Sequence, residues 1–124
     1  MSQRVGLVGH CGADTVYLRI AVGGAVKGAD VTIADDEAEL RQLIAEGVDL
    51  LLVNRLLEGG FEADEGVELI RQLRAEHPEL KLMLVSNYDD AQSAAAQAGA
   101  LPGFGKREIG SPRVKQLLQN ALGK

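Results

Sequence analysis

The sequence predicts a three-layer α/β/α sandwich, in which a five-stranded parallel sheet lies between two layers of helices. Short apolar runs of strand length alternate with segments long enough to form helices, which is the β-α repeat of a parallel sheet. The five runs are Val5 to Gly9, Val31 to Ala34, Leu50 to Val53, Leu80 to Val85 and Leu101 to Phe104. No internal repeat, linker or low-complexity tract divides the 124 residues, so we expect a single domain over residues 1–124.

The segment after the first run is the least clear of the expected helices. One set of its apolar residues alternates as in a strand: Val16, Leu18, Ile20 and Val22. A second set recurs at helical spacing: Tyr17, Ile20, Ala21 and Gly24. A strand here would need a hairpin, whereas parallel strands need a crossover connection. We therefore expect a helix whose apolar face is the second set.

Capping patterns mark the next two helices. Asp36 followed by Glu39 is a capping-box pattern that begins a helix, and Gly47 ends it. The helix after the third run ends at the His77-Pro78 pair, because the residue before a proline avoids helical geometry. Its apolar positions recur at helical spacing: Val67, Leu69, Ile70 and Leu73.

The last part of the chain carries similar signals. Asp89 or Asp90 is expected to cap an alanine-rich helix over Ala91 to Ala98, before Gly99. Ser111 and Pro112 form an N-cap and first-turn pair for a final amphipathic helix. Pro102 has no N–H for a ladder bond, which places the fifth strand at an edge of the sheet.

Composition excludes several function classes. The formal charge of -5 argues against binding nucleic-acid phosphates, which requires clustered Lys and Arg. The chain has neither an apolar run of bilayer length nor a signal-peptide pattern, so we expect a cytoplasmic protein without membrane contact. Cys11 is the sole cysteine, which leaves no internal disulfide and no zinc-binding cluster.

Three runs are followed by polar residues at their carboxyl ends: Asn54 closes the third, Ser86 the fourth and Lys106 the fifth. With five β-α units in one short chain, this pattern resembles the receiver domain of two-component response regulators. The resemblance implies a flavodoxin-like fold with strand order 2-1-3-4-5. In that family an Asp after the third strand takes a phosphoryl group from a histidine kinase, and acidic residues after the first strand bind Mg²⁺. A Ser or Thr and a Lys after the next two strands bind the phosphoryl oxygens.

The sequence departs from this family at the positions that carry its chemistry. Asn54 replaces the acceptor Asp, and His10 with Cys11 replaces the acidic pair, which removes the carboxylates that Mg²⁺ prefers. Gly103 stands where a Tyr or Phe often switches rotamer, and Arg107 where a Pro normally follows the lysine.

We therefore expect an atypical receiver that acts in phosphorelay-type signalling through protein contacts. We expect it to be no enzyme, to hold no metal or cofactor, and to accept no phosphoryl group at Asn54. Without a phosphoryl group, Lys106 is expected to pair with Asn54 and a backbone carbonyl. The expected partner surface combines the Ala91 to Ala98 helix, the fifth strand and the last helix, with a homodimer as one candidate arrangement.

Two alternatives use the same residues. Cys11 with His10 stands where a strand turns into a helix, and the N–H groups at a helix start can favour a thiolate. The loop is similar to that of sugar-phosphotransferase IIB proteins, so a thiol-dependent enzyme or redox sensor is the principal alternative. A small-ligand sensor that uses the crevice beside His10, Asn54 and Lys106 is the other.

Overall fold

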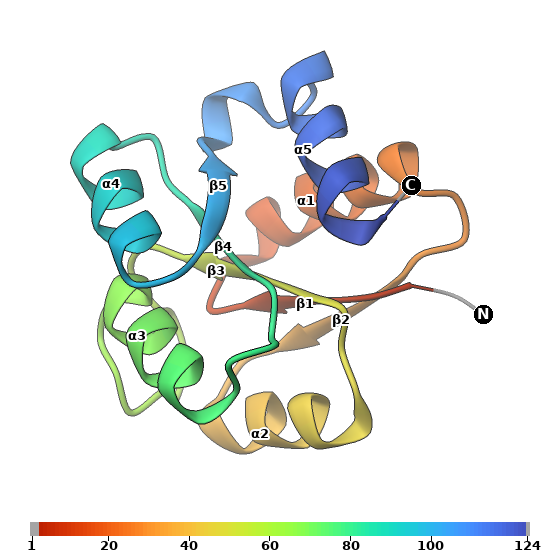
Figure 1. The fold of residues 1–124 in the computed structure, drawn as a ribbon. Coiled ribbons are helices and arrows are strands. Elements are labelled where there is room, and N and C mark those ends of the chain that lie inside the picture. The colour runs from red at the N-terminus through yellow and green to blue at the C-terminus, as the bar shows by residue number, and fades with distance from the viewer. Residues whose placement is uncertain (1–2, 124) are drawn as a thin grey trace.

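Five strands alternate with five α-helices in the computed structural model, which describes residues 3–123 (Figure 1). The strands are β1 (Arg4–Val8), β2 (Asp30–Ala34), β3 (Leu50–Asn54), β4 (Leu82–Val85) and β5 (Leu101–Phe104). The helices are α1 (Gly12–Ala25), α2 (Glu37–Glu46), α3 (Gly66–Glu76), α4 (Asp89–Gln97) and α5 (Pro112–Leu122), with a 3-10 turn η1 (Lys106–Glu108) before α5. None of the helices in this part of the chain is long and apolar enough to cross a bilayer.

The strands form one parallel sheet in the order β2-β1-β3-β4-β5, which confirms the predicted topology. β5 lies at an edge, as Pro102 predicts. Every residue of the central strand β3 is buried, because helices cover both faces of a parallel sheet. The carboxyl ends of all five strands therefore meet at the same edge.

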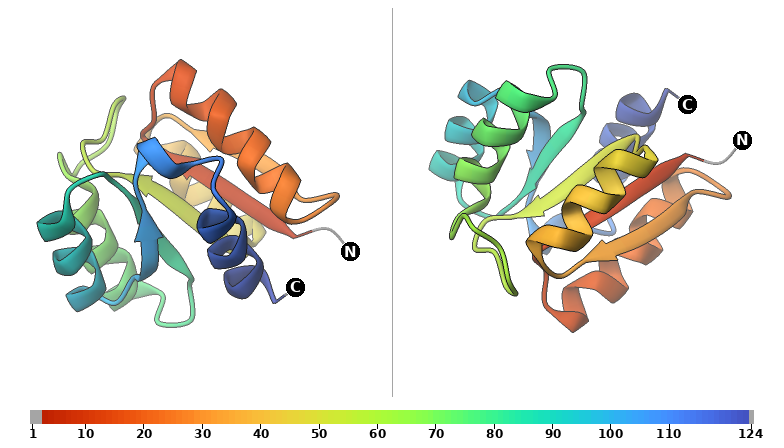
Figure 2. Two further views of the ribbon diagram at one scale, coloured as in Figure 1. Left: turned by 90° about the horizontal axis from the view of Figure 1, so that it is seen from above. Right: turned by 90° about the horizontal axis from the view of Figure 1, so that it is seen from below.

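The sheet lies between two layers of helices (Figures 1 and 2), and a hydrophobic core fills the space on each of its faces. Side chains alternate along a strand, so Leu50 and Leu52 pack into the core beneath α1 and α5. Leu51 and Val53 enter the opposite core, beneath α2, α3 and α4. This packing fixes the register of β3 and with it the position of Asn54 at the carboxyl edge.

The capping predictions for three helices are confirmed. Asp36 accepts a hydrogen bond from the Glu39 N–H at 2.7 Å, and Ser111 accepts one from the Val114 N–H at 3.3 Å. His77 is the residue that ends α3.

The predicted helix α1 is confirmed, but the predicted apolar face was wrong. Its buried residues are Thr15, Leu18, Val22 and Ala25. Tyr17 is 61% exposed and Ile20 is 67% exposed. Because α1 is apolar around most of its circumference, periodicity alone does not decide which face is buried.

The predicted start of α4 was also wrong. Its N-cap is Tyr88, so Asp89 and Asp90 lie within the first turn, where carboxylates favour the positive end of the helix dipole. The Ser86 hydroxyl accepts the Tyr88 N–H at 3.1 Å, and this turn leads the chain into the helix early. Gly99 follows the helix with a φ of 106°, as its position predicts.

Candidate functional site

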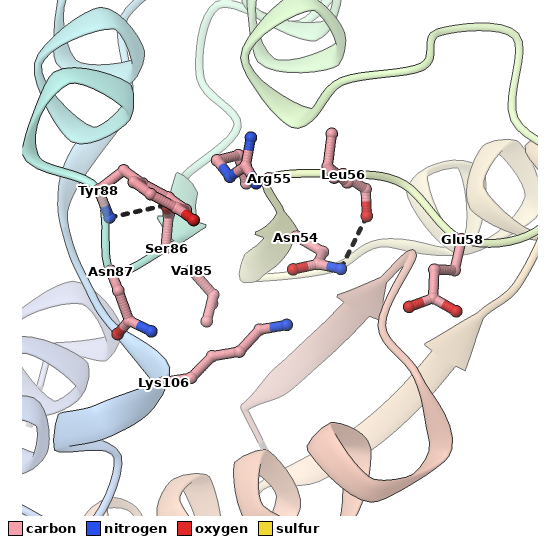
Figure 3. Close-up of a pocket in the computed structure, with 9 residues that line it drawn as sticks. All are labelled: Asn54, Arg55, Leu56, Glu58, Val85, Ser86, Asn87, Tyr88 and Lys106. Atoms are coloured by element: carbon pink, nitrogen blue, oxygen red, sulfur yellow. Dashed lines mark hydrogen bonds between the residues drawn. The ribbon is translucent and has the colours of Figure 1, made fainter.

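A cavity of about 190 Å³ opens at the carboxyl edge of the sheet, between the ends of β3 and β4 and the start of η1 (Figure 3). Its lining residues are Asn54, Arg55, Leu56, Glu58, Val85, Ser86, Asn87, Tyr88 and Lys106. Three of the residues singled out by the sequence, Asn54, Ser86 and Lys106, thus line one cavity. His10 and Cys11 lie on the neighbouring turn after β1 and are not among the lining residues.

Asn54 is held by its own amide group. The side chain is buried, and its Nδ2 donates to the carbonyls of Gly9 at 3.0 Å and Leu56 at 2.7 Å. Both partners are carbonyl oxygens, so the amide nitrogen rather than the oxygen must face them. The two N–H donors therefore tie β3 to the loops that follow β1 and β3.

Gly66 at the start of α3 lies directly against this strand end. Its N–H donates to the Arg55 carbonyl at 2.7 Å, and a Cβ added at this position would be 2.1 Å from the Asn54 carbonyl oxygen. Only glycine lets α3 begin so close to the backbone of β3.

Gly66→Ala is therefore expected to lower the free energy of unfolding by about 1–3 kcal/mol, the usual range for a steric overlap in a packed site. Urea unfolding followed by circular dichroism measures the change. Gly12→Ala is the matched control, because an added Cβ there meets no described atom within 4 Å beyond the adjacent residues and the backbone of its own helix. Equal stabilities of the two variants would contradict the close approach.

Ser86 and Tyr88 form the β4 side of the cavity. Ser86 is buried, and its backbone N–H donates to the Phe104 carbonyl at 2.9 Å, which joins the ends of β4 and β5. The Arg55 guanidinium lies 4.5 Å from the centre of the Tyr88 ring, in a cation-π contact. Arg55 and Tyr88 form one wall of the cavity (Figure 3).

Lys106 crosses the cavity with its amine directed towards Asn54 (Figure 3), but its charge is paired elsewhere. Its Nζ lies 2.6 Å from Oδ2 of Asp14, in the first turn of α1. The predicted pairing with Asn54 and a backbone carbonyl is thus replaced by an ion pair. Partial burial raises the pKa of Asp14, but hydrogen bonds from Lys106 and Cys11 outweigh it and hold that pKa below its usual value.

His10 is a buried neutral base beside this ion pair. Its Nε2 lies 2.8 Å from the Leu52 carbonyl oxygen, so that nitrogen carries the proton. Within the described chain, Nδ1 is buried without a hydrogen-bond partner. Burial lowers the pKa of His10 to about 4, although the Leu52 carbonyl partly offsets the effect.

Cys11 is the N-cap of α1 and is half-buried. Its thiol lies beside the Asp14 carboxylate and helps to lower the pKa of that group. His10 Nδ1, unpartnered among the described residues, does not accept the thiol proton. The two residues are neighbours in the turn, but they are not arranged as a nucleophile and its base.

The residues at this edge do not fit the Mg²⁺ that the resemblance implies. Across residues 3–123, no three side chains of His, Cys, Asp or Glu are grouped so that they could hold a metal ion. The amide nitrogen of Asn54 is bound to the Gly9 and Leu56 carbonyls, so this residue offers a cation a single neutral oxygen. Glu58 is the one carboxylate among the described residues that lines the cavity. Asp14 is paired with Lys106. This donor set is unsuited to a hard cation that needs several oxygen ligands.

Sequence reasoning missed four residues of this edge: Asp14, Arg55, Asn87 and Tyr88. Asp14 stands three residues after Cys11 in the first turn of α1, and an acidic residue there was the available signal. The others follow Asn54 and Ser86 closely in the chain, so proximity to a strand end could have indicated them.

The sheet order and the crevice at its carboxyl edge define a doubly wound α/β fold of the flavodoxin-like class. Within that class, the chain has the fold of response-regulator receiver domains, as similar solved structures show. No family model matches the sequence, and no curated protein matches it.

Three of these structures show the extent of the similarity. A protein of Chloroflexus aurantiacus, described as a response regulator, has a TM-score of 0.81 at 21% identity, with 100% of both chains covered. The non-phosphorylated receiver domain of RcsB from Escherichia coli has a TM-score of 0.78 at 16% identity, over 100% of this chain and 96% of that one. A response regulator from Thermotoga maritima has a TM-score of 0.75 at 22% identity, again over 100% of both chains.

Proposed function

We propose that this chain is an atypical receiver domain that signals through protein contacts and accepts no phosphoryl group. The observation that carries the proposal is the state of Asn54. Its buried amide uses both N–H donors on backbone carbonyls at the position where the receiver family has its acceptor Asp. An amide is not a nucleophile for phosphoryl transfer, which needs an in-line attacking group and cations on the phosphoryl oxygens.

The Lys106–Asp14 ion pair supports the same function. In receiver domains this lysine binds the phosphoryl oxygens, but here its ammonium is neutralised by a carboxylate from α1 at 2.6 Å. Lys106 is also the first residue of η1, so the ion pair joins η1 to α1. The lysine thus has a structural partner without a phosphoryl group.

The contacts of Gln92 and the position of Gly103 support a partner surface that keeps one conformation. The Gln92 Nε2 lies 2.9, 3.1 and 3.2 Å from the carbonyl oxygens of Leu84, Ser86 and Phe104, so its two N–H groups are shared among three acceptors. A Cβ at position 103 would lie 2.7 Å from Gln92 Oε1 and 2.2 Å from the Leu84 carbonyl oxygen. Gln92 therefore joins α4 to the ends of β4 and β5. Its side chain also occupies the space that an aromatic side chain at position 103 would need.

The proposed partner is a protein that binds the face formed by α4, β5 and α5, which the Gln92 contacts hold in one arrangement. The whole described chain would act as one receiver-like domain. Its output would depend on presenting this surface, and not on a change of phosphorylation state.

The proposal is tested by incubating the protein with acetyl phosphate and Mg²⁺ and measuring its intact mass. The unmodified mass is expected for the wild type and for Asn54→Asp, because the turn after β1 carries His10 and Cys11 in place of metal-binding carboxylates. Circular dichroism verifies that the variant is folded. A stable phosphoryl adduct on the wild type would refute the proposal, and one on the variant would show that a working metal site remains.

Thiol alkylation tests the principal alternative. Because Cys11 is half-buried and the neighbouring His10 Nδ1 takes no hydrogen bond from its thiol, iodoacetamide is expected to label the protein slowly at neutral pH. Cys11→Ala gives the background. Rapid labelling of the wild type at neutral pH would favour a thiol-dependent enzyme or redox sensor.

A further inference from the structure

The outer face of α1 is apolar over most of its length. Val16, Tyr17 and Ile20 are 56%, 61% and 67% exposed, and Gly23 and Gly24 continue the same face towards the end of the helix. The outward side of a surface helix is normally polar, and a helix that is apolar all round is normally buried. We propose that this face is an interface between two copies of the chain.

The face carries no charge that would oppose such contact. Between Asp14 and the end of α1, Arg19 is the only charged residue, and its guanidinium lies against the Val31 carbonyl at 3.4 Å, on the β2 side of the helix. A second copy also carries a net charge of -5, so two copies repel each other overall. This repulsion opposes contact least at a surface that has no carboxylates. The outer face of α1 meets this condition.

The two glycines indicate a close approach by another backbone. Glycine inside a helix costs about 0.5–1 kcal/mol relative to alanine. Apart from the adjacent residues and the backbone of α1 itself, no described atom lies within 4 Å of a Cβ added at Gly23 or Gly24, so packing within the described chain does not require either glycine. A second helix lying across these positions would require small residues there.

The arrangement of large and small residues favours a second copy as the occupant. The large residues Tyr17 and Ile20 stand in the middle of α1, and the glycines lie one turn further along. In an antiparallel pair related by a two-fold axis near Ile20, Tyr17 of each copy faces Gly24 of the other. Such an interface is self-complementary, as two-fold symmetry demands.

A hollow beside α1 extends the contact surface. It has a volume of about 410 Å³, and Tyr17, Ile20, Ala21 and Ile109 supply its apolar lining. Its charged lining is the Asp14–Lys106 ion pair, together with Arg107. A 14-residue helix is about 21 Å long, so a helix pair alone falls short of a standard interface of roughly 800 Å² per partner. With the residues beside α5, the surface fits a weak, reversible dimer.

Sedimentation of the full chain over a range of concentrations tests the proposal. We expect a monomer–dimer equilibrium, and Ile20→Glu is expected to weaken it at least about tenfold, by placing like charges near the axis. Ala96→Glu, which adds the same charge to an exposed position of α4, is the matched control and should leave the equilibrium unchanged. A protein that stays monomeric at millimolar concentration, or a dimer that Ala96→Glu dissociates, would overturn the proposal.

Gly24→Leu distinguishes a fitted interface from a merely adhesive apolar patch. Leucine is a better helix former than glycine, so the dilute monomer should become more stable to heat. The added side chain occupies the space for Tyr17 of the second copy, so dimerisation should weaken while monomer stability rises. Stronger association of this variant would contradict the proposed fit.

Discussion

Asn54→Asp is expected to lower the free energy of unfolding by about 2–4 kcal/mol at pH 7, because it places a buried carboxylate oxygen against two backbone carbonyls. The wild-type Nδ2 donates to both the Gly9 and the Leu56 carbonyls. In the variant a carboxylate oxygen takes the place of this nitrogen and is repelled by both carbonyl oxygens. Burial and these carbonyls should raise the pKa of the new carboxyl group. The loss of stability should therefore be smallest near pH 4 and grow as the pH rises.

Urea unfolding of the wild type and variant between pH 4 and pH 8 measures this effect. Asn87→Asp is the matched control, since Asn87 is exposed and already uses its side-chain oxygen to accept the Arg107 N–H at 3.1 Å. The control should change stability by less than about 0.5 kcal/mol. A stable Asn54→Asp variant would mean that the strand end tolerates an anion, as an acceptor site must.

His10 is expected to make the protein less stable as the pH falls from about 6.5 to about 4. Burial lowers the pKa of His10 from 6.5 to about 4 in the folded state, so the unfolded chain binds the extra proton in this interval. Stability is fully present above pH 6.5 and falls by about 3 kcal/mol by the lower limit, since each pKa unit corresponds to about 1.4 kcal/mol. The lowered pKa of Asp14 acts in the same direction, but only at pH values below its usual value of 3.8.

Unfolding midpoints at pH 7 and pH 4.5 measure the His10 contribution. His10→Gln keeps an N–H donor for the Leu52 carbonyl but does not titrate, so the difference between the two pH values should shrink. His77→Gln, which replaces the other histidine, is the control. If the pH dependence disappeared in His77→Gln and remained in His10→Gln, its source would be His77. That result would contradict the prediction.

The element order and sheet topology could be predicted because they depend on features that lie close together in the sequence. Apolar runs and helix caps such as Asp36 and Ser111 are local signals, and Pro102 alone was enough to place β5 at an edge. The buried face of α1 could not be predicted, since Tyr17 and Leu18 are both apolar and only packing against the sheet separates them. The first residue of α4 could not be predicted either, because it depends on the turn in which the Ser86 hydroxyl accepts the Tyr88 N–H.

The strand-end residues of the site could be predicted, but their partners could not. Polar residues after buried strands pointed to Asn54, Ser86 and Lys106, which do line one cavity. The Lys106–Asp14 ion pair joins segments from opposite ends of the chain, and no local pattern indicates it. The Gln92 contacts likewise arise only when α4 lies over the ends of β4 and β5.

The central claim is that this pocket neither accepts a phosphoryl group nor changes the surface beside it. Amide nuclear magnetic resonance spectra of the wild type, recorded before and after adding Mg²⁺ with acetyl phosphate, test both parts together. We expect the signals of Asn54, Ser86, Lys106 and the α4–β5–α5 face to keep their positions. A new set of signals that spreads from Asn54 to this face, and decays as the acetyl phosphate is consumed, would contradict it.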